Sequence, residues 1–237
     1  AELQDNMGSK EPKVLPANSS EYGPNWYEDV GIGTKPGDTW YYYLHMGCMH
    51  CTYPACVEAC PSNAIYKRSD GIVLINQELC KGFKSCIEAC PYKRIFWNDQ
   101  LRVAEKCIMC YPLLEQKQPP VCVTSCSGRA IFFGNIKDPN TMVAKLVNKY
   151  KIALPLHPEY KTESNIYYVP PIFTAAKGGT DSRAEETIRI PEKHLLEMFG
   201  PQVTKAIAVL QAERQKTITG KYSELMEILS TYPTYEL

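Results

Sequence analysis

The sequence has 237 residues, with 26 Lys and Arg against 26 Asp and Glu, so its formal net charge is zero. A balanced charge argues against a nucleic-acid partner, because binding to a polyphosphate depends on excess positive charge. With 44% hydrophobic and 11% aromatic residues the composition is globular, and no uninterrupted apolar run approaches the ~18 residues of a membrane span.

The first part of the chain, residues 1–40, is rich in Gly, Pro, Asn, Ser and charged side chains, which predicts an extended surface segment. Residues 41–44 predict a short strand that leads into a cysteine-rich region. We expect that region to cover residues 41–137. A third part, residues 138–237, is expected to be helical and extended and to pack on the core and on partner subunits.

Within this third part, Asp138 and Pro139 are typical of a helix start, with Asp as the N-cap and Pro at the first helical position. Apolar residues follow at helical spacing: Met142, Val143, Leu146, Val147 and Tyr150. Residues 152–175 predict extended backbone, and residues 177–182 predict a flexible loop.

The C-terminal stretch predicts two or three helices. The first begins near Pro191 and stops at Gly200 and Pro201. The next has an apolar face made of Val203, Ala206, Ile207 and Leu210, and the last has one made of Tyr222, Leu225, Met226 and Leu229. Such faces indicate either packing against the body of the chain or an arm that docks on a partner subunit.

All eleven cysteines lie between Cys48 and Cys126. An odd count does not suit a closed set of disulfides, so this density indicates bound metal. A unit of two cysteines separated by three residues, with Ile five residues after the second Cys, occurs three times and marks an internal repeat.

The cysteines form three groups. The first group is Cys48, Cys51, Cys56 and Cys60; the second is Cys80, Cys86 and Cys90; the third is Cys107, Cys110, Cys122 and Cys126. The second group has the bacterial ferredoxin spacing C-x2-C-x2-C-x3-C-P, with Phe83 in place of one Cys. The first and third groups are the same run with one insertion each, and the insertion is longer in the third group.

In a two-cluster ferredoxin the fourth Cys of each run ligates the other cluster. This crossover predicts a first set of four thiolates for one [4Fe-4S] cluster: Cys48, Cys51, Cys56 and Cys90. It predicts a second set of three for the neighbouring cluster: Cys60, Cys80 and Cys86. Because Phe83 cannot coordinate iron, the second set favours [3Fe-4S], with a [4Fe-4S] cluster that has one non-thiolate ligand as the alternative.

The third group leaves two interpretations open. A third set, Cys107, Cys110 and Cys122, would hold one cluster, and Cys126 would serve another whose motif lies upstream of Ala1. We would then expect about four further cysteines upstream. Alternatively, all four cysteines close on a single [4Fe-4S] cluster or zinc ion.

The remaining candidate residues have less specific signals. Zinc knuckles also use C-x2-C pairs, but zinc does not explain the two C-x3-C-P runs or Phe83. His50 is interpreted as a donor near the cluster or a packing residue rather than a ligand. Several basic residues follow the cysteine motifs. They are interpreted either as solvated surface residues or as charges that raise the reduction potentials of the clusters: Lys67, Arg68, Lys93, Arg94 and Arg129. The sequence has no recognisable set of catalytic residues, so we interpret the chain itself as a non-catalytic electron-transfer protein.

Residues 48–134 resemble the iron–sulfur (beta) subunits of molybdenum enzymes in the dimethyl sulfoxide reductase superfamily. The resemblance is carried by CMHCTYPACVEACP at residues 48–61, AIYKR at 64–68, DGIVLI at 70–75 and CPYKR at 90–94. It extends through YYVPP at 167–171, MFGP at 198–201 and SELM at 223–226. Within this superfamily the sequence is similar to the beta subunits of ethylbenzene and dimethyl sulfide dehydrogenases and of selenate, chlorate and perchlorate reductases. Respiratory nitrate reductase is more distant.

The resemblance implies an α+β fold of two ferredoxin-like modules that carry four clusters, with long loops and a C-terminal helical extension. It supports the first and second sets, and it implies that an N-terminal motif completes the cluster of Cys107, Cys110 and Cys122 and the cluster of Cys126. The implied function is a relay of single electrons between a molybdopterin catalytic subunit and a haem b subunit or cytochrome. The [3Fe-4S] cluster would lie toward the haem.

The resemblance also implies a location. Family members of the soluble class work in the periplasm and are exported with a signal-bearing catalytic partner, which fits a chain without a membrane span. The alternative is a nitrate reductase-type complex attached to the cytoplasmic side of the inner membrane. The substrate and the direction of its reaction belong to the partner and are not predicted by this chain.

Overall fold

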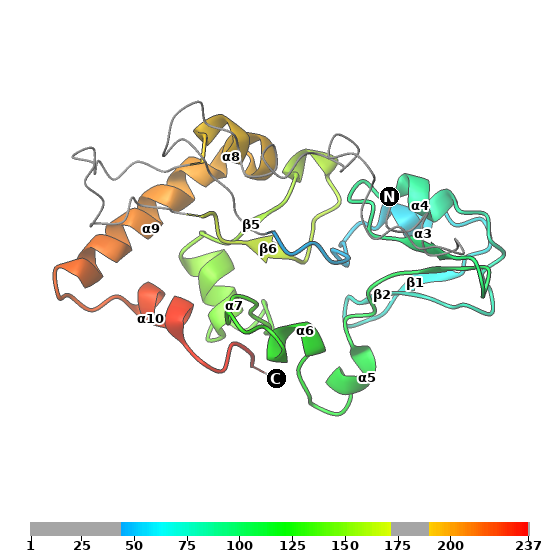
Figure 1. Ribbon diagram of the computed structural model, residues 1–237, viewed down its shortest axis with the longest axis horizontal. Coiled ribbons are helices and arrows are strands. Elements are labelled where there is room, and N and C mark those ends of the chain that lie inside the picture. Colours follow the sequence, from blue (N-terminus) through cyan, green and yellow to red (C-terminus); the bar gives the residue numbers. More distant parts are fainter. Residues whose placement is uncertain (1–43, 172–189, 237) are drawn as a thin grey trace, which may run out of the picture. The chain divides into compact units, whose positions relative to one another are not determined.

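The computed structural model describes residues 44–171 and 190–236 (Figure 1). Nearly all of them belong to one compact unit that consists of His45–Ile172 and Glu192–Leu237. The predicted surface segment at residues 1–40, the strand at 41–44 except Leu44, and the loop at 177–182 lie outside the described residues. The boundaries expected at residues 40 and 137 stay predictions.

Two copies of one small unit form the first half of the described chain, and each copy is a short helix followed by a hairpin (Figure 1). In the first copy, α3 (Ala55–Glu58) precedes β1 (Ile65–Lys67) and β2 (Val73–Ile75). The two strands pair antiparallel, with Ile65 opposite Ile75. Gly71 takes a positive φ of 92° between the strands, a conformation that glycine adopts without a Cβ clash.

The second copy repeats this arrangement with α4 (Ser85–Ala89), β3 (Phe96–Asn98) and β4 (Val103–Glu105). Its strands also pair antiparallel, with Phe96 opposite Glu105, and α3 packs against α4. The buried core shared by the two copies consists of Ile65, Val73, Cys86, Ile95 and Ala104. Two of the three repeats predicted from the cysteine spacing are therefore repeats of structure.

Two short helices follow in the third cysteine group: α5 (Tyr111–Leu114) lies in its insertion, and α6 (Val121–Thr124) belongs to its Cys-x3-Cys unit. Each begins directly beside a cysteine or a proline: Cys110 caps α5 in a left-handed conformation, and Pro120 caps α6. The insertion thus adds one helix, and the Cys-x3-Cys unit keeps its own.

The helix expected at residue 138 starts three residues later than predicted, and the prediction that Asp138 is its N-cap is wrong. The helix α7 (Met142–Ala144) continues as the π-helical turn η3 (Lys145–Lys149). Thr141 is the cap and accepts a hydrogen bond from the Ala144 N–H at 3.2 Å. Asp138 instead accepts from the Asn140 N–H at 2.9 Å and closes a turn. The Met142 N–H is bonded by Glu236 from the far end of the chain, so a tertiary contact sets the start.

Extended backbone follows, as the prolines predict, in β5 (Leu154–Pro155) and β6 (Tyr167–Tyr168), which pair antiparallel, with the 3-10 turn η4 (Pro158–Tyr160) between them. The segment between the turn and β6 is bonded to the first cysteine loop. The Thr52 N–H donates to the Glu163 carbonyl at 2.8 Å, the Tyr53 N–H to that of Thr162 at 3.0 Å, and the Asn165 N–H to that of Met49 at 3.0 Å. The second half of the chain therefore supports the first cysteine group.

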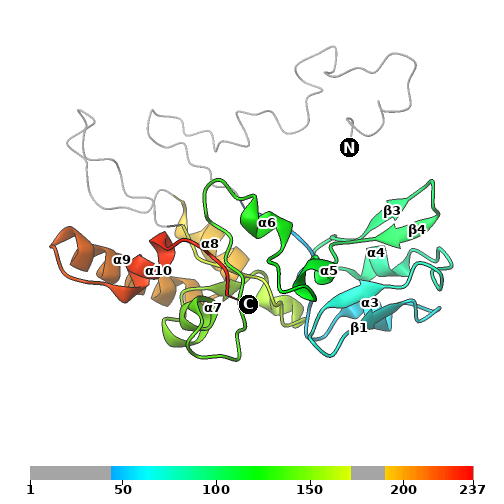
Figure 2. The same ribbon diagram turned by 90° about the horizontal axis from the view of Figure 1, so that it is seen from below.

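Three helices complete the described chain, α8 (Glu192–Phe199), α9 (Gln202–Ile218) and α10 (Glu224–Ser230). Figure 2 shows α9 and α10 side by side, and α8 and α10 both pack on α9. The predicted apolar face of α9 is buried within the chain: Val203, Ala206, Ile207 and Leu210. In α10 the buried residues are Leu225 and Ile228, whereas Tyr222 is exposed and precedes the helix, so its place on that face was predicted wrongly.

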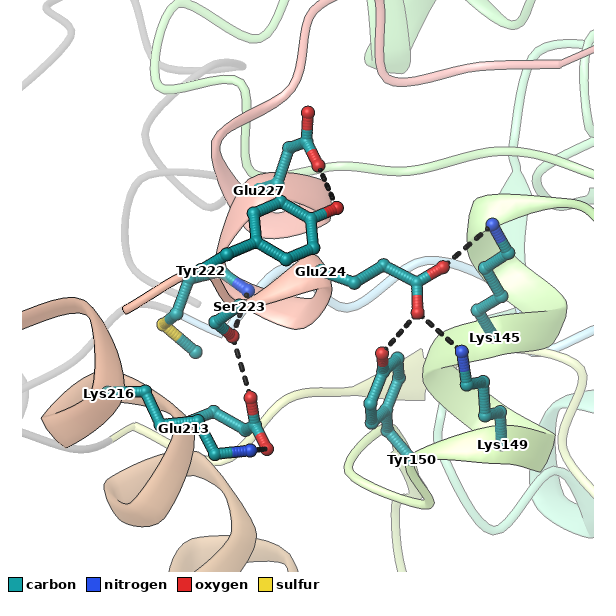
Figure 3. Close-up of polar contacts among 10 residues, drawn as sticks. Lys145, Lys149, Tyr150, Glu213, Lys216, Tyr222, Ser223, Glu224 and Glu227 are labelled. Carbon is teal, nitrogen blue, oxygen red and sulfur yellow. Dashed lines mark hydrogen bonds and ion pairs between the residues drawn. The ribbon is translucent and has the colours of Figure 1, made fainter. Parts of the chain in front are cut away.

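Polar contacts join α10 to its neighbours (Figure 3). The Glu224 carboxylate lies against Lys145 at 3.1 Å, pairs with Lys149, and accepts a hydrogen bond from the Tyr150 hydroxyl. Ser223 caps the helix by accepting from the Met226 N–H at 3.2 Å and donates to Glu213 of α9 at 2.7 Å.

Within the described residues, no helix is long and apolar enough to cross a membrane.

Candidate metal centre

The four thiols of the first set come together from both copies of the repeat. The pKa of Cys56 is raised to about 12, first by burial and then by the nearby thiols of Cys48, Cys90 and Cys51. Burial also raises the pKa of Cys51, to which Cys90 adds. Cys90 therefore lies with the cysteines of the first group rather than with those of its own group.

The second set is gathered in the same way. Burial raises the pKa of Cys86, followed by the charges of Cys60 and Cys80. These three cysteines line one pocket that encloses about 320 Å³ of empty space, counted out to its mouth. Phe83 lines the same pocket and is 61% exposed. The residue that replaces a cysteine in the sequence thus stands at the edge of the second set.

The third set is identified by the effect of its other two thiols on Cys122. Burial raises its pKa first, and the thiols of Cys107 and Cys110 raise it next. The first and third sets are neighbours, because Cys107 is also one of the charges that raise the pKa of Cys48. The first and second sets are neighbours as well, since their cysteines pack around the same buried core: Cys56, Cys60, Cys80, Cys86 and Cys90.

The last cysteine of each group has one geometry. The Arg94 N–H donates to the Cys90 sulfur at 3.4 Å and the Ala130 N–H to the Cys126 sulfur at 3.3 Å. The equivalent N–H of Ala64 donates to Cys60; burial alone would raise the pKa of that thiol, but this bond and those from Ser62 and Ile65 lower it. In each case the donor follows four residues later. Cys126 therefore has the local geometry of Cys60 and Cys90.

His50 lies inside the first cysteine loop and is only 2% exposed. Its Nδ1 accepts the Val73 N–H at 3.1 Å, which places the ring proton on Nε2 in the neutral form. Burial, aided by the positive charge of Lys106, lowers the pKa of His50 to about 3, so the ring is neutral. Among the described residues, Nε2 has no hydrogen-bond partner. A buried donor left unpaired costs about 1–3 kcal/mol, so an acceptor is expected there.

Lys106 is a site residue that the sequence reasoning missed. Its ammonium donates to the Val73 carbonyl and, at 3.0 Å, to the Cys107 carbonyl. The charge of Lys106 opposes the burial that raises the pKa of Cys48 and of Cys56. The sequence shows only that Lys106 lies directly before Cys107, whereas its proximity to the first set results from the tertiary structure.

The basic residues singled out from the sequence divide between the two roles considered. Lys67 donates to the Thr52 carbonyl at 3.0 Å, and its charge lowers the pKa of Cys51 against the effect of burial. Arg68 instead pairs with Asp70 and Glu115 at the surface. The guanidinium of Arg129 lies over the Tyr232 ring at 4.5 Å. Lys93 donates to the Glu88 carbonyl and Arg94 to that of Tyr92.

The residues present fit iron–sulfur clusters. Each set consists of thiols alone, the donors that hold such clusters, and the buried Nε2 of His50 requires an acceptor that cluster or ligand sulfur would supply. Across residues 44–171 and 190–236, no three His, Cys, Asp or Glu side chains surround a position that one metal ion could occupy. Zinc needs its ligands at one point, whereas the thiolates of a cluster bind different iron atoms.

Comparisons with known proteins agree with this chemistry. Residues 39–136 match the family described as a 4Fe-4S dicluster domain. The chain is 45% identical over 221 residues to the perchlorate reductase subunit beta of Dechloromonas aromatica, covering 93% of this chain and 66% of that protein. It is 44% identical over 227 residues to the dimethylsulfide dehydrogenase subunit beta of Rhodovulum sulfidophilum, covering 95% and 69%.

A further relative is the respiratory nitrate reductase subunit beta of Haloferax mediterranei, 44% identical over 230 residues, which cover 94% of this chain and 64% of that protein. The chain thus spans about two thirds of the length of these curated relatives. Because these alignments cover 93–95% of this chain, they extend beyond the matched residues 39–136 into the C-terminal part.

Proposed function

The chain belongs to the family of iron–sulfur beta subunits of multi-subunit oxidoreductases, whose role is electron transfer, and we propose that its three thiol sets hold a row of clusters through which single electrons pass. The observation that carries the proposal is that cysteines of different groups lie together in the first set. Clusters so held supply one-electron redox chemistry; the residues of this chain position them, exclude water and set the surrounding charge.

In the first set, Cys48, Cys51, Cys56 and Cys90 would ligate a [4Fe-4S] cluster. Support comes from the mutual effects of these thiols and from the amide that donates to Cys90. Ile65 and Ile95, the residues that follow the two units, are both buried in the adjacent core. The chain thereby excludes water from one side of the site.

In the second set, Cys60, Cys80 and Cys86 would ligate a [3Fe-4S] cluster. Phe83 lines their pocket without offering an atom that binds metal, and three thiolates match the three irons of that cluster. A [4Fe-4S] cluster with one non-thiolate ligand is the alternative, and its outcome in the test below differs.

In the third set, Cys107, Cys110 and Cys122 would ligate a [4Fe-4S] cluster, and Cys126 would ligate a further one. The hydrogen bond from a backbone N–H to Cys126 matches those to Cys60 and Cys90, the two cysteines with crossover roles. This match favours the assignment over four ligands on one metal. No cysteine of this sequence precedes Cys48, so completion by an N-terminal motif stays a prediction.

These assignments order the clusters. The first set lies near the third, since Cys107 raises the pKa of Cys48, and it shares a core with the second. The first cluster would therefore lie between the other two. A molybdopterin catalytic subunit is the proposed partner on the side of the third set, and a haem b subunit or cytochrome on the side of the second.

The surface beside the second set suits a redox partner. An open pocket there is lined by three basic residues and one acidic residue, together with Trp97, next to Cys80: Lys81, Lys84, Arg102 and Asp99. Phe83, Phe96 and Leu101 are exposed. Apolar side chains among positive charges are typical of a protein interface. The exposed edge of the second set thus supports electron exchange at this end.

The zinc-stabilised interaction module is disfavoured by the match to a 4Fe-4S dicluster domain. A membrane-attached nitrate reductase-type complex is matched no better than the other relatives. Periplasmic export with the catalytic partner is part of the proposal and rests on the resemblance of the motifs. The substrate is the partner's.

The test is metal analysis and electron paramagnetic resonance of the subunit in its native complex. We expect iron and acid-labile sulfide, and an oxidised-state [3Fe-4S] signal that disappears in the Phe83→Cys variant as a fourth thiolate becomes available. Tyr222→Cys, at an exposed aromatic residue outside the second set and outside this surface, is the control. Abundant zinc without sulfide would contradict the function, and a native protein without the [3Fe-4S] signal would contradict the three-ligand assignment.

A further inference from the structure

We propose that Lys106 is a tuning residue between the first and third clusters, where its fixed positive charge raises the reduction potential of the first cluster. The inference rests on the proposed function, because it requires clusters in both sets. An electron that passes between the third cluster and the first oxidises one and reduces the other, and no bond forms or breaks.

The position of the ammonium is set by two backbone carbonyls. One is that of Cys107, a member of the third set, and the other is that of Val73 on β2. The Val73 N–H in turn donates to Nδ1 of His50, which lies between Cys48 and Cys51. A single residue of β2 therefore joins the ammonium to the first cysteine loop, and the charge is held where the two sets meet.

The charge of Lys106 reaches the first set. Its ammonium is held beside the loop that carries Cys48 and Cys51, and its charge opposes the burial that raises the pKa of Cys48 and of Cys56. Lys106 therefore stabilises negative charge that is added to the first set.

The neighbourhood keeps this charge effective. His50 beside it is buried, and its Nδ1 accepts the Val73 N–H, so the ring is neutral and neither adds to nor cancels the charge. A charge acts more strongly at short distance in a partly buried site than in water. An electron that arrives on the first cluster makes it more negative, and a nearby cation stabilises that reduced state and raises its potential.

The experiment measures reduction potentials by electron paramagnetic resonance titration of the whole complex. The signal of the first cluster is identified by its loss in Cys56→Ser. Lys106→Gln and Lys106→Met remove the charge, and both are expected to lower the potential of the first cluster and leave that of the second unchanged. Lys106→Arg, which keeps the charge, and Lys205→Gln, an exposed lysine of α9, are expected to retain the native potential.

Each outcome decides. A native potential in Lys106→Gln with all clusters present would overturn the inference, and so would loss of iron in both neutral variants, because the ammonium would then be structural. An equal fall at every cluster would also overturn it, since the effect would not be local. A native complex without [4Fe-4S] signals would instead contradict the proposed function, before any variant is compared.

Discussion

At the scale of single residues, the site consists of thiols held by amides and covered by a few apolar side chains. Ile65 follows the first Cys-x3-Cys unit by five residues and is 3% exposed, in contact with the core that the cysteines line. A residue at that position can cover a bound cluster from water. A side chain of this kind contributes both packing energy and protection of the metal.

Ile65→Ala is expected to destabilise the protein by about 2–5 kcal/mol, the range for truncating a large buried aliphatic side chain, and to speed the loss of iron to a chelator. The thermal midpoint under anaerobic conditions and the rate of iron release measure the two effects. Ile218→Ala, at a position that is 59% exposed, is the control and should change neither. Equal behaviour of the two variants would show that Ile65 does not cover the site.

At the scale of elements, the sequence predicted the repeated unit and the positions of α8 and α9. The cysteine spacing and the apolar faces are local patterns, and they were sufficient for those elements. The start of α7 was not predictable in this way, because its first free N–H is bonded by Glu236. Lys106 was missed for the same reason: it reaches the first set only because β4 ends beside Val73.

Glu224 provides a test at this scale, because it joins α10 to η3 through Lys145, Lys149 and Tyr150. These contacts, that with Lys149 first, lower the pKa of Glu224 to about 2, from about 4.3 for an unfolded chain. The folded pKa is the lower one, so the contribution of the carboxylate to stability is complete above pH ~4.3 and is lost as the pH falls toward 2.

Glu224→Gln is therefore expected to raise hydrogen exchange in residues 223–230 at pH 7, and its difference from the native protein should shrink between pH ~4.3 and 2. Glu197→Gln, which removes an exposed pair with Lys193 within α8, is the control. A difference that stays constant across this pH range would mean that the carboxylate charge does not hold α10.

At the scale of the whole molecule, the described strands form only two-stranded sheets. Isolated two-stranded hairpins are marginally stable, and the core between the two hairpins is lined by cysteines. In contrast, the helices α8, α9 and α10 bury apolar residues that are not part of this core, among them Leu195, Val203 and Leu225. The two parts should therefore depend differently on the metal.

Removing iron with a chelator under reducing conditions is expected to abolish the slow hydrogen exchange of β1–β4 and to leave that of α9 largely intact. Reconstitution with iron and sulfide should restore the hairpins, which controls for irreversible damage. Unchanged protection of the hairpins after iron removal would show that they fold without the clusters.

The last cysteine of each group accepts a hydrogen bond from a backbone N–H, and this has a consequence for where the chain can become longer. Four residues separate Cys60, Cys90 and Cys126 from their donors, whereas the stretch before each Cys-x3-Cys unit varies and in the third group contains the whole of α5. Insertions are thus accommodated ahead of the unit and excluded behind it. Loops that face other proteins can be remodelled while the spacing from metal to metal is preserved.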